Sequence, residues 1–282
     1  MTTVPGALSS APPDQAAGLR QLFQQSQVRF IPLVSNPHVA FTGVMLERLS
    51  SAFADLDLHT LVVDAGEHSP APQELALLDL SEGVETLSPQ MSYLAARGLS
   101  LRHVDASGST ASFLRATADA APHADVVLLH APASELARLF AHRSVRPLLL
   151  ADDRPDSVTH AYAGLKILAH RAGLMAHDLL LAAAPHSPRA GRIATHLAQC
   201  ADQFVGAVLH DCVRIDPASA ATDAIDPTLQ RFVRTLLLAC EPGAALNAEP
   251  RVPAHNPADW MSLAAARNPS TQPPRVRAWA AN

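Results

Sequence analysis

The stretch VRFIPLVSNPHVAFTGVMLERLSSAFADLDLHTLVVD, which covers residues 28–64, decides the fold of this chain. Residues 28–34 form an apolar run with the length of a buried strand, and residues 60–64 form a second such run that ends in an acid. Between them, residues 44–54 place apolar side chains at helical spacing after a loop at residues 35–43. The stretch therefore predicts a strand, a loop, a helix and a second strand, in that order.

The rest of the chain repeats this alternation of strands and helices. Further strands are predicted at residues 99–104, 125–130, 146–151, 178–184 and 205–210. Further helices are predicted at residues 72–80, 91–97, 111–121, 133–141, 156–172, 189–204 and 227–240. Because strands that alternate with helices pair in parallel and bury both faces of their sheet, we expect an α/β fold. Its doubly wound, mostly parallel sheet should carry helices on both faces.

Composition and charge limit the class of protein. The 282 residues are 48% apolar, enough for a sizeable core, and their formal net charge of −5 favours neither nucleic acid nor an anionic membrane as main partner. The three cysteines are widely spaced and form no metal-binding pair, as is typical of a reducing cytosol. No apolar run is long enough to span a membrane, and the start of the sequence lacks a signal-peptide pattern. We therefore expect a cytoplasmic protein with at most weak membrane association.

The loop at residues 35–43 has the position of a phosphate-binding loop but not its chemistry. Free backbone N–H groups and the helix dipole favour an anion where a strand feeds a loop that opens a helix. Such loops are rich in glycine and carry a lysine followed by Ser or Thr. This loop keeps one glycine, Gly43, while Pro37 removes a backbone donor and the only lysine of the chain is Lys166. The sequence thus indicates a phosphate-binding loop that has lost its phosphate.

The two ends of the chain differ in composition from its centre. Residues 1–25 are expected to form a flexible leader that contains a short helix. The apolar side chains on one face of this helix are Ala16, Leu19, Leu22 and Phe23. Residues 241–282 are rich in Pro, Ala and Asn, which predicts a largely disordered tail. The α/β domain is expected between them, at residues 26–240.

Other residues of chemical interest have simpler explanations. His38, His68 and His130 follow strands whose ends meet at one edge of the sheet, but no HxH or HExxH spacing supports a metal site. No serine stands in a GxSxG context, so nucleophilic catalysis is not expected. Tyr162 and Lys166 lie four residues apart on one predicted helix, where we expect Tyr162 to pack and Lys166 to be solvated or paired. The apolar stripe of the last helix is expected to close the core.

Taken in order, these elements resemble the MinD/ParA class of deviant-loop ATPases. Within that class they are most similar to FlhG, also called FleN, which sets flagellar number and placement. Residues 14–20, DQAAGLR, resemble the N-terminal DQAxxLR motif of FlhG. Residues 151–168, ADDRPDSVTHAYAGLKIL, resemble the strand-end sequence TPEPTSITDAYALIKVL of that family. Residues 28–64 align without gaps with its loop, helix and following strand, so the likeness covers roughly residues 14–240.

The resemblance implies a partner for the leader. In FlhG the DQAxxLR segment stimulates the GTPase FlhF, so an FlhF-like GTPase is the implied partner here, with other flagellar assembly components as further candidates. Recruitment to the cell pole or membrane would then occur through that partner. Gln15 and Arg20 would face the partner, while Leu19 and Phe23 anchor the helix. The implied partner-binding residues are Asp14, Gln15, Ala16, Leu19, Arg20 and Phe23. Without the resemblance, an ordinary amphipathic leader helix explains the same pattern.

The departures from the family pattern remove every charged contact to phosphate and magnesium in these motifs. The family's GKGGVGKT aligns with residues 36–43, so that its two lysines fall on Pro37 and Thr42 and its magnesium-binding Thr on Gly43. The first acid of the family's DAD is kept and the second is replaced by glycine, while a histidine begins the segment that aligns with DTGAG. The residues of this degenerate nucleotide site are Asn36, Pro37, His38, Thr42, Gly43, Asp64 and His130.

These losses predict a protein without nucleotide chemistry. A hydrogen bond to a charged group contributes roughly 1.5–3 kcal/mol, so two lost lysines weaken binding by about 3–6 kcal/mol, or about two to four decades in affinity. We expect no catalytic residues, no cofactor, weak or absent binding of ATP and magnesium, and a monomer. The favoured hypothesis is a non-enzymatic, FlhG-like pseudo-ATPase that regulates flagellar biogenesis by activating FlhF. The alternatives are an active MinD/ParA-like ATPase with an atypical loop, or a scaffold for another ParA-type positioning or secretion system.

Overall fold

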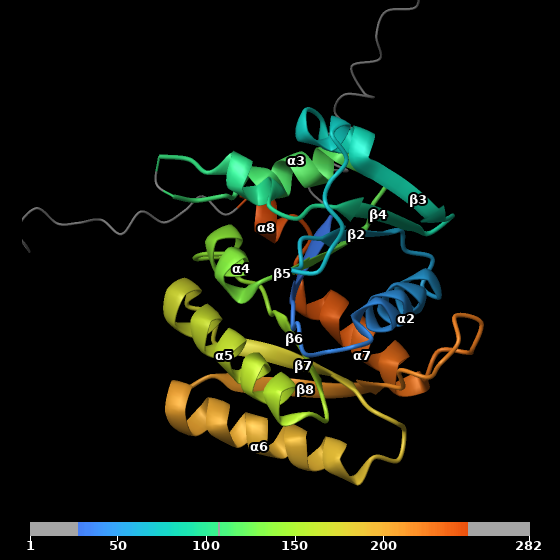
Figure 1. The fold of residues 1–282 in the computed structure, drawn as a ribbon, viewed down its shortest axis with the longest axis vertical. Helices are drawn as coiled ribbons and strands as arrows, with labels where there is room; N and C mark the ends of the chain where they lie inside the picture. Colours follow the sequence, from blue (N-terminus) through green and yellow to red (C-terminus); the bar gives the residue numbers. More distant parts are fainter. Residues whose placement is uncertain (1–27, 107, 248–282) are drawn as a thin grey trace, which may run out of the picture. The chain divides into compact units, whose positions relative to one another are not determined.

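The computed structural model describes residues 28–106 and 108–247, all within the compact unit Met1–Pro250. Its strands form one eight-stranded sheet in the order β3-β4-β2-β5-β1-β6-β7-β8 (Figure 1). The strands are β1 (Arg29–Val34), β2 (Thr60–Asp64), β3 (Val84–Ser88), β4 (Met91–Ala95), β5 (Val126–Ala131), β6 (Leu148–Asp152), β7 (Ala176–Ala182) and β8 (Val208–Ile215). Among the described residues, every neighbouring pair is parallel except β3 with β4. The expected mostly parallel sheet is confirmed.

Helices cover both faces of this sheet, as a doubly wound fold requires. One face packs against α3, α4, α5 and α6, and the other against α2 and α7 (Figure 1). The helices are α2 (Thr42–Ala54), α3 (Ser112–Ala120), α4 (Ala133–Leu139), α5 (Pro155–Ala172), α6 (Pro188–Val205), α7 (Pro227–Ala239) and α8 (Ala244–Asn247). The apolar stripe of α7 is buried in the core, as expected, through Leu229, Phe232, Val233 and Leu236.

The segment between β2 and α3 differs from its sequence-based expectation. Residues 91–97 were predicted as a helix, but Met91–Ala95 is strand β4, which pairs with β3 in an antiparallel hairpin. Residues 99–104 were predicted as a strand, but Leu99–His103 is the 3-10 helix η3, because Gly98 adopts a left-handed conformation with φ 76° and turns the chain. The helix predicted at residues 72–80 is replaced by two short 3-10 helices, η1 (Leu75–Leu77) and η2 (Leu80–Gly83). All three predictions were wrong.

The described fold continues beyond residue 240, where the tail was expected to begin. Helix α8 packs near the start of β1, since Gly243 donates its backbone N–H to the carbonyl of Val28 over 3.1 Å. The buried guanidinium of Arg143 donates a hydrogen bond to the carbonyl of Ala245 in α8. Within residues 28–106 and 108–247, no helix is both long and apolar enough to cross a membrane.

Candidate functional site

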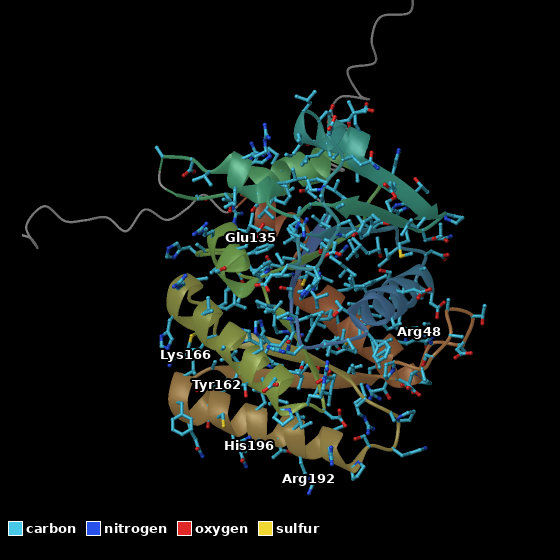
Figure 2. All side chains as sticks on the ribbon, in the orientation of Figure 1. Arg48, Glu135, Tyr162, Lys166, Arg192 and His196 are labelled. Atoms are coloured by element: carbon cyan, nitrogen blue, oxygen red, sulfur yellow. The ribbon has the colours of Figure 1, made fainter. Side chains whose placement is uncertain are left out.

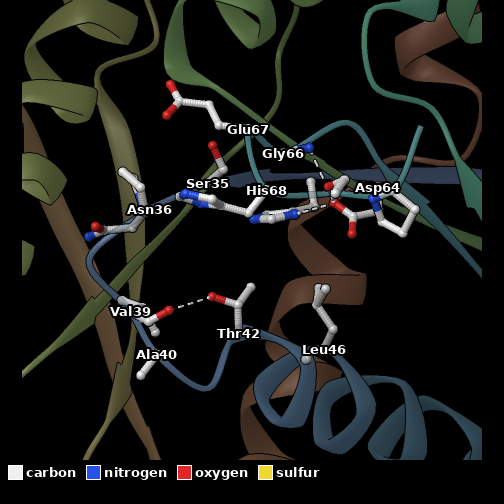
Figure 3. Close-up of a pocket in the computed structure, with 15 residues that line it drawn as sticks. Ser35, Asn36, Val39, Ala40, Thr42, Leu46, Asp64, Gly66, Glu67 and His68 are labelled. Carbon is white, nitrogen blue, oxygen red and sulfur yellow. Dashed lines mark hydrogen bonds and ion pairs between the residues drawn. The ribbon is translucent and has the colours of Figure 1, made fainter. Parts of the chain in front are cut away.

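A pocket of about 400 Å³ opens at the carboxyl ends of β1, β2 and β5 (Figure 3). In an open parallel sheet, this edge is where ligands bind. The loop after β1 and the first turn of α2 form one wall, and the segment after β2 forms the other. Its lining residues are Ser35, Asn36, Pro37, Val39, Ala40, Thr42, Gly43, Leu46, Asp64, Gly66, Glu67, His68, Ser69, Pro70 and His130.

Asn36 fixes the loop that follows β1. Its side-chain amide is buried and donates hydrogen bonds to the backbone carbonyls of Leu150 (2.8 Å) and Ser157 (2.9 Å). Its side-chain oxygen accepts the backbone N–H of His38 over 3.1 Å, as in an Asx-turn. Because these contacts join the ends of β1 and β6 to the start of α5, the loop has a conformation set by the protein itself.

The start of α2 supplies polar backbone groups but no positive side chain. Phe41 occupies the N-cap position without a side-chain cap, and the hydroxyl of Thr42 donates back to the carbonyl of Val39 over 3.2 Å (Figure 3). Among the described residues that line the pocket there is no Lys or Arg, whereas the acids Asp64 and Glu67 both contribute.

Four donors converge on the carboxylate of Asp64 at the end of β2. Its Oδ1 accepts hydrogen bonds from Nδ1 of His130 (2.7 Å), from the backbone N–H of Gly66 (3.2 Å) and from the hydroxyl of Ser69. Its Oδ2 accepts the hydroxyl of Tyr93 over 3.2 Å. Burial alone would raise the pKa of Asp64, but the hydrogen bond and charge of His130, together with Ser69 and Gly66, lower this pKa to about 2.

His130 and Gly66 fit each other closely. A Cβ added to Gly66 would lie 2.8 Å from Cε1 of His130, closer than such atoms approach, and a tight 3.0 Å from Oγ of Ser69. Gly66 stands where the resemblance places the family's second acid, and His130 begins the segment that aligns with DTGAG. Gly66 therefore leaves room for the imidazole of His130, which pairs with Asp64.

The residues present do not supply the contacts that a nucleoside triphosphate with magnesium requires. The Asp64 carboxylate is already occupied by four donors from the protein. No group of three or more His, Cys, Asp or Glu side chains within the described ranges is arranged to hold a metal ion. The lining carries no lysine to oppose phosphate charge, since Lys166 is exposed on α5, as Figure 2 shows. The carboxylate of Asp64 is thus bonded to donors of the protein itself, and the pocket lining carries no cationic Lys or Arg side chain.

The serine, histidine and aspartate of this pocket do not form a nucleophilic triad. In such a triad the serine hydroxyl bonds to the histidine, which the aspartate orients. Here the hydroxyl of Ser69 bonds to Asp64 instead. Nε2 of His130 is buried and has no hydrogen-bond partner among the described residues. The serine hydroxyl is therefore bonded to the aspartate and not to the histidine.

The structure brings together most of the site residues named from the sequence. Asn36, Pro37, Thr42, Gly43, Asp64 and His130 all line the pocket. His38 is exposed and lies outside the lining, where its ring makes an edge contact with His160 at 5.6 Å between centroids. Tyr162 packs against the core and Lys166 is exposed, as expected (Figure 2).

Some residues named from the sequence fall outside the described part of the chain. The leader residues expected to bind a partner, at positions 14–23, are among them. Sequence reasoning missed the contributions of Ser69 and Tyr93 to the Asp64 network. The signal in the sequence that pointed to this network was the pair Gly66 and His130, at positions where the resemblance implies an acid and the start of DTGAG.

The sheet order and the helices on both faces define an α/β protein whose fold is shared with two solved proteins, a McdA variant and a plasmid partition protein. A McdA variant from Cyanothece, solved with ATP, aligns with a TM-score of 0.51 at 14% identity over 76% of this chain and 96% of that chain. A plasmid partition protein from Borrelia burgdorferi aligns with a TM-score of 0.51 at 8% identity over 74% of this chain and 99% of that chain. A ParA family ATPase from Chlorobium tepidum TLS aligns with a TM-score of 0.46 at 14% identity, over 78% and 90%. At these identities the likeness concerns the fold. No protein-family model and no curated protein matches the sequence.

Proposed function

We propose that this chain is a non-enzymatic regulator of flagellar biogenesis, an FlhG-like pseudo-ATPase whose leader activates an FlhF-like GTPase. The observation that carries the proposal is the state of Asp64. Its carboxylate accepts hydrogen bonds from Gly66, Ser69, Tyr93 and His130, which leaves it unsuited to bind magnesium or orient water. The lysine-free lining argues in the same direction, because no side chain there balances the charge of a triphosphate.

In this proposal the folded body is a scaffold with a single conformation. Two sets of side-chain hydrogen bonds support that role. The buried amide of Asn36 holds the pocket loop to β6 and α5. On the other side of α2, the guanidinium of Arg48 donates to the carbonyls of Ala220 (3.2 Å), Asp223 (2.7 Å) and Ala224 (2.8 Å), beside the loop that precedes α7 (Figure 2). Both sets of hydrogen bonds are made within the chain, so neither requires a bound ligand to form.

The test is GTP hydrolysis by an FlhF-like GTPase from the same cell. Its rate is measured alone, with the full-length protein, and with a Gln15→Ala variant of the leader. The proposal predicts that the protein accelerates hydrolysis and that Gln15→Ala removes the acceleration. Equal rates with and without the intact protein would refute the activator role.

A parallel assay separates this function from the ATPase alternative. Phosphate release from ATP is followed with the purified protein in the presence of magnesium. The proposal predicts no release above buffer. A sustained, magnesium-dependent turnover that Asp64→Ala abolishes would favour an active ATPase with an unusual loop.

A further inference from the structure

Two histidines from distant parts of the sequence meet beside the Asp64 pocket. His38 is exposed in the loop after β1, and His160 is half-buried on α5. Their rings make an edge contact, with 5.6 Å between the ring centres and 68° between the ring planes. The proposed function uses neither side chain. These two residues are called the histidine pair below.

The spacing of the two rings is close to that of imidazoles that share a metal ion. A Zn–N bond is about 2.0–2.1 Å long and the ring centre lies about 1.1 Å behind the nitrogen, so each ring centre is about 3.2 Å from the ion. At a tetrahedral angle of about 110°, the two ring centres are then about 5.2 Å apart. The observed 5.6 Å exceeds this value by little, and a small rotation of the exposed His38 side chain closes the difference.

The side chain of Asn36 holds both members of the histidine pair in position. Its oxygen accepts the backbone N–H of His38 over 3.1 Å. Its amide donates to the carbonyl of Ser157 over 2.9 Å, and Ser157 lies three residues before His160 on α5. Because this buried side chain joins the loop to the helix before any ligand arrives, a ligand held between them costs little additional conformational entropy.

The charges next to the histidine pair favour a cation. Asp156 is exposed and lies four residues before His160, which places both residues on one face of α5. In the part of the chain that the structure describes, no ion pair involves Asp156. Arg154, at the start of the helix, is already paired with Asp152 over 2.8 Å. Asp156 is therefore available as a third ligand, and water can complete a four-coordinate ion.

We propose that His38 and His160 bind a divalent transition-metal ion, with Zn²⁺ as the expected ion. Imidazole suits Zn²⁺, Ni²⁺ and Cu²⁺, whereas Mg²⁺ and Ca²⁺ prefer oxygen ligands. The bound ion links the loop after β1 to α5, beside the pocket. This inference goes beyond the proposed function and does not rest on it, since Asp64 is not a ligand and neither a nucleotide nor a GTPase takes part.

The test is a calorimetric titration of the full-length protein with zinc chloride at neutral pH. It is repeated with His38→Ala, with His160→Ala and with the variant that carries both substitutions. His170→Ala and His196→Ala are the matched controls. His170 is exposed further along α5, and His196 is exposed on α6 with its Nε2 4.0 Å from the sulfur of Cys200, a contact between two other possible zinc ligands.

The wild type should bind Zn²⁺, and either substitution in the histidine pair should weaken this binding by at least about tenfold, since even the loss of a residue that only supports a ligand costs 10–100-fold. Because both rings hold the same ion, the double variant should show no further loss, and the two controls should keep the wild-type affinity. A wild type that does not bind Zn²⁺, or full affinity in either single variant, would overturn the proposal. Additive losses in the double variant would overturn it as well, because the two histidines would then hold different ions. Losses of the same size in the controls would place the binding outside the histidine pair.

Discussion

The imidazole of His130 occupies the space, at the edge of the sheet, that a side chain on Gly66 would need. A Cβ on Gly66 would approach Cε1 of His130 to 2.8 Å. The ring so placed bonds to Asp64 over 2.7 Å. The site is thus built from mutually dependent residues, which makes it testable one position at a time.

Gly66→Ala should destabilise the protein by about 1–3 kcal/mol, the usual cost of inserting a methyl group into a packed interior. Urea denaturation measures the change. Gly43→Ala is the matched control, since an added Cβ there has no described atom within 4 Å and the residue lies in α2. Alanine at that position should be neutral or stabilising by up to about 1 kcal/mol. Equal destabilisation by both variants would contradict the described fit of Gly66 to His130.

Asn36→Ala should destabilise the protein by about 2–3 kcal/mol. The substitution leaves the buried carbonyl of Leu150 without its donor and removes the hydrogen bond to the carbonyl of Ser157. His38→Ala, an exposed neighbour in the same loop, should change the stability by less than about 0.5 kcal/mol. A result in which both variants unfold at the wild-type urea concentration would show that the loop is not held by Asn36.

The burial of His177 in β7 predicts that the folded protein loses stability in mild acid. Its side chain is fully buried, neither ring nitrogen has a partner among the described residues, and burial lowers its pKa from 6.5 to about 4. The unfolded chain therefore binds a proton that the folded chain does not, and stability falls as the pH decreases from about 6.5 to 4. The expected contribution of this group is up to about 3 kcal/mol.

The measurement for His177 is urea denaturation between pH 4 and pH 7. His177→Leu should flatten the dependence on pH, whereas His170→Gln, at an exposed position on α5, should not. If the pH profiles of the wild type and His177→Leu coincide, the histidine is either hydrated or paired in solution.

The parallel sheet could be predicted from the sequence, because buried strands and amphipathic helices place their apolar residues at different intervals. The antiparallel hairpin β3–β4 could not be predicted in this way. A helix-start pattern is formed by Ser88, Pro89 and Gln90, but these residues lie at the end of β3 and in the turn that leads to β4. The residues of β4 alternate between buried and half-buried, as in a strand. Short apolar runs leave helix and strand ambiguous, and pairing with β2 decides the outcome.

The candidate site, too, could be predicted from the sequence only in part. The absence of lysine from residues 35–43 and of an acid from position 66 is visible in the sequence, because it concerns residue types at fixed positions. The hydrogen-bond network around Asp64 is not visible. Tyr93 and His130 reach Asp64 only through the sheet order β4-β2-β5, and Ser69 reaches it through the fold of the loop after β2. Burial and hydrogen bonding, rather than spacing along the chain, determine that Asp64 is satisfied.

The most direct test of the account is a calorimetric titration of the full-length protein with ATP, carried out once with magnesium and once with a chelator. A protein whose Asp64 carboxylate is fully occupied and whose pocket lacks a cationic side chain should give the same negligible heat in both titrations, with no binding in the micromolar range. Micromolar binding of ATP that requires magnesium would contradict the account, because it would show that the site still works as a nucleotide switch.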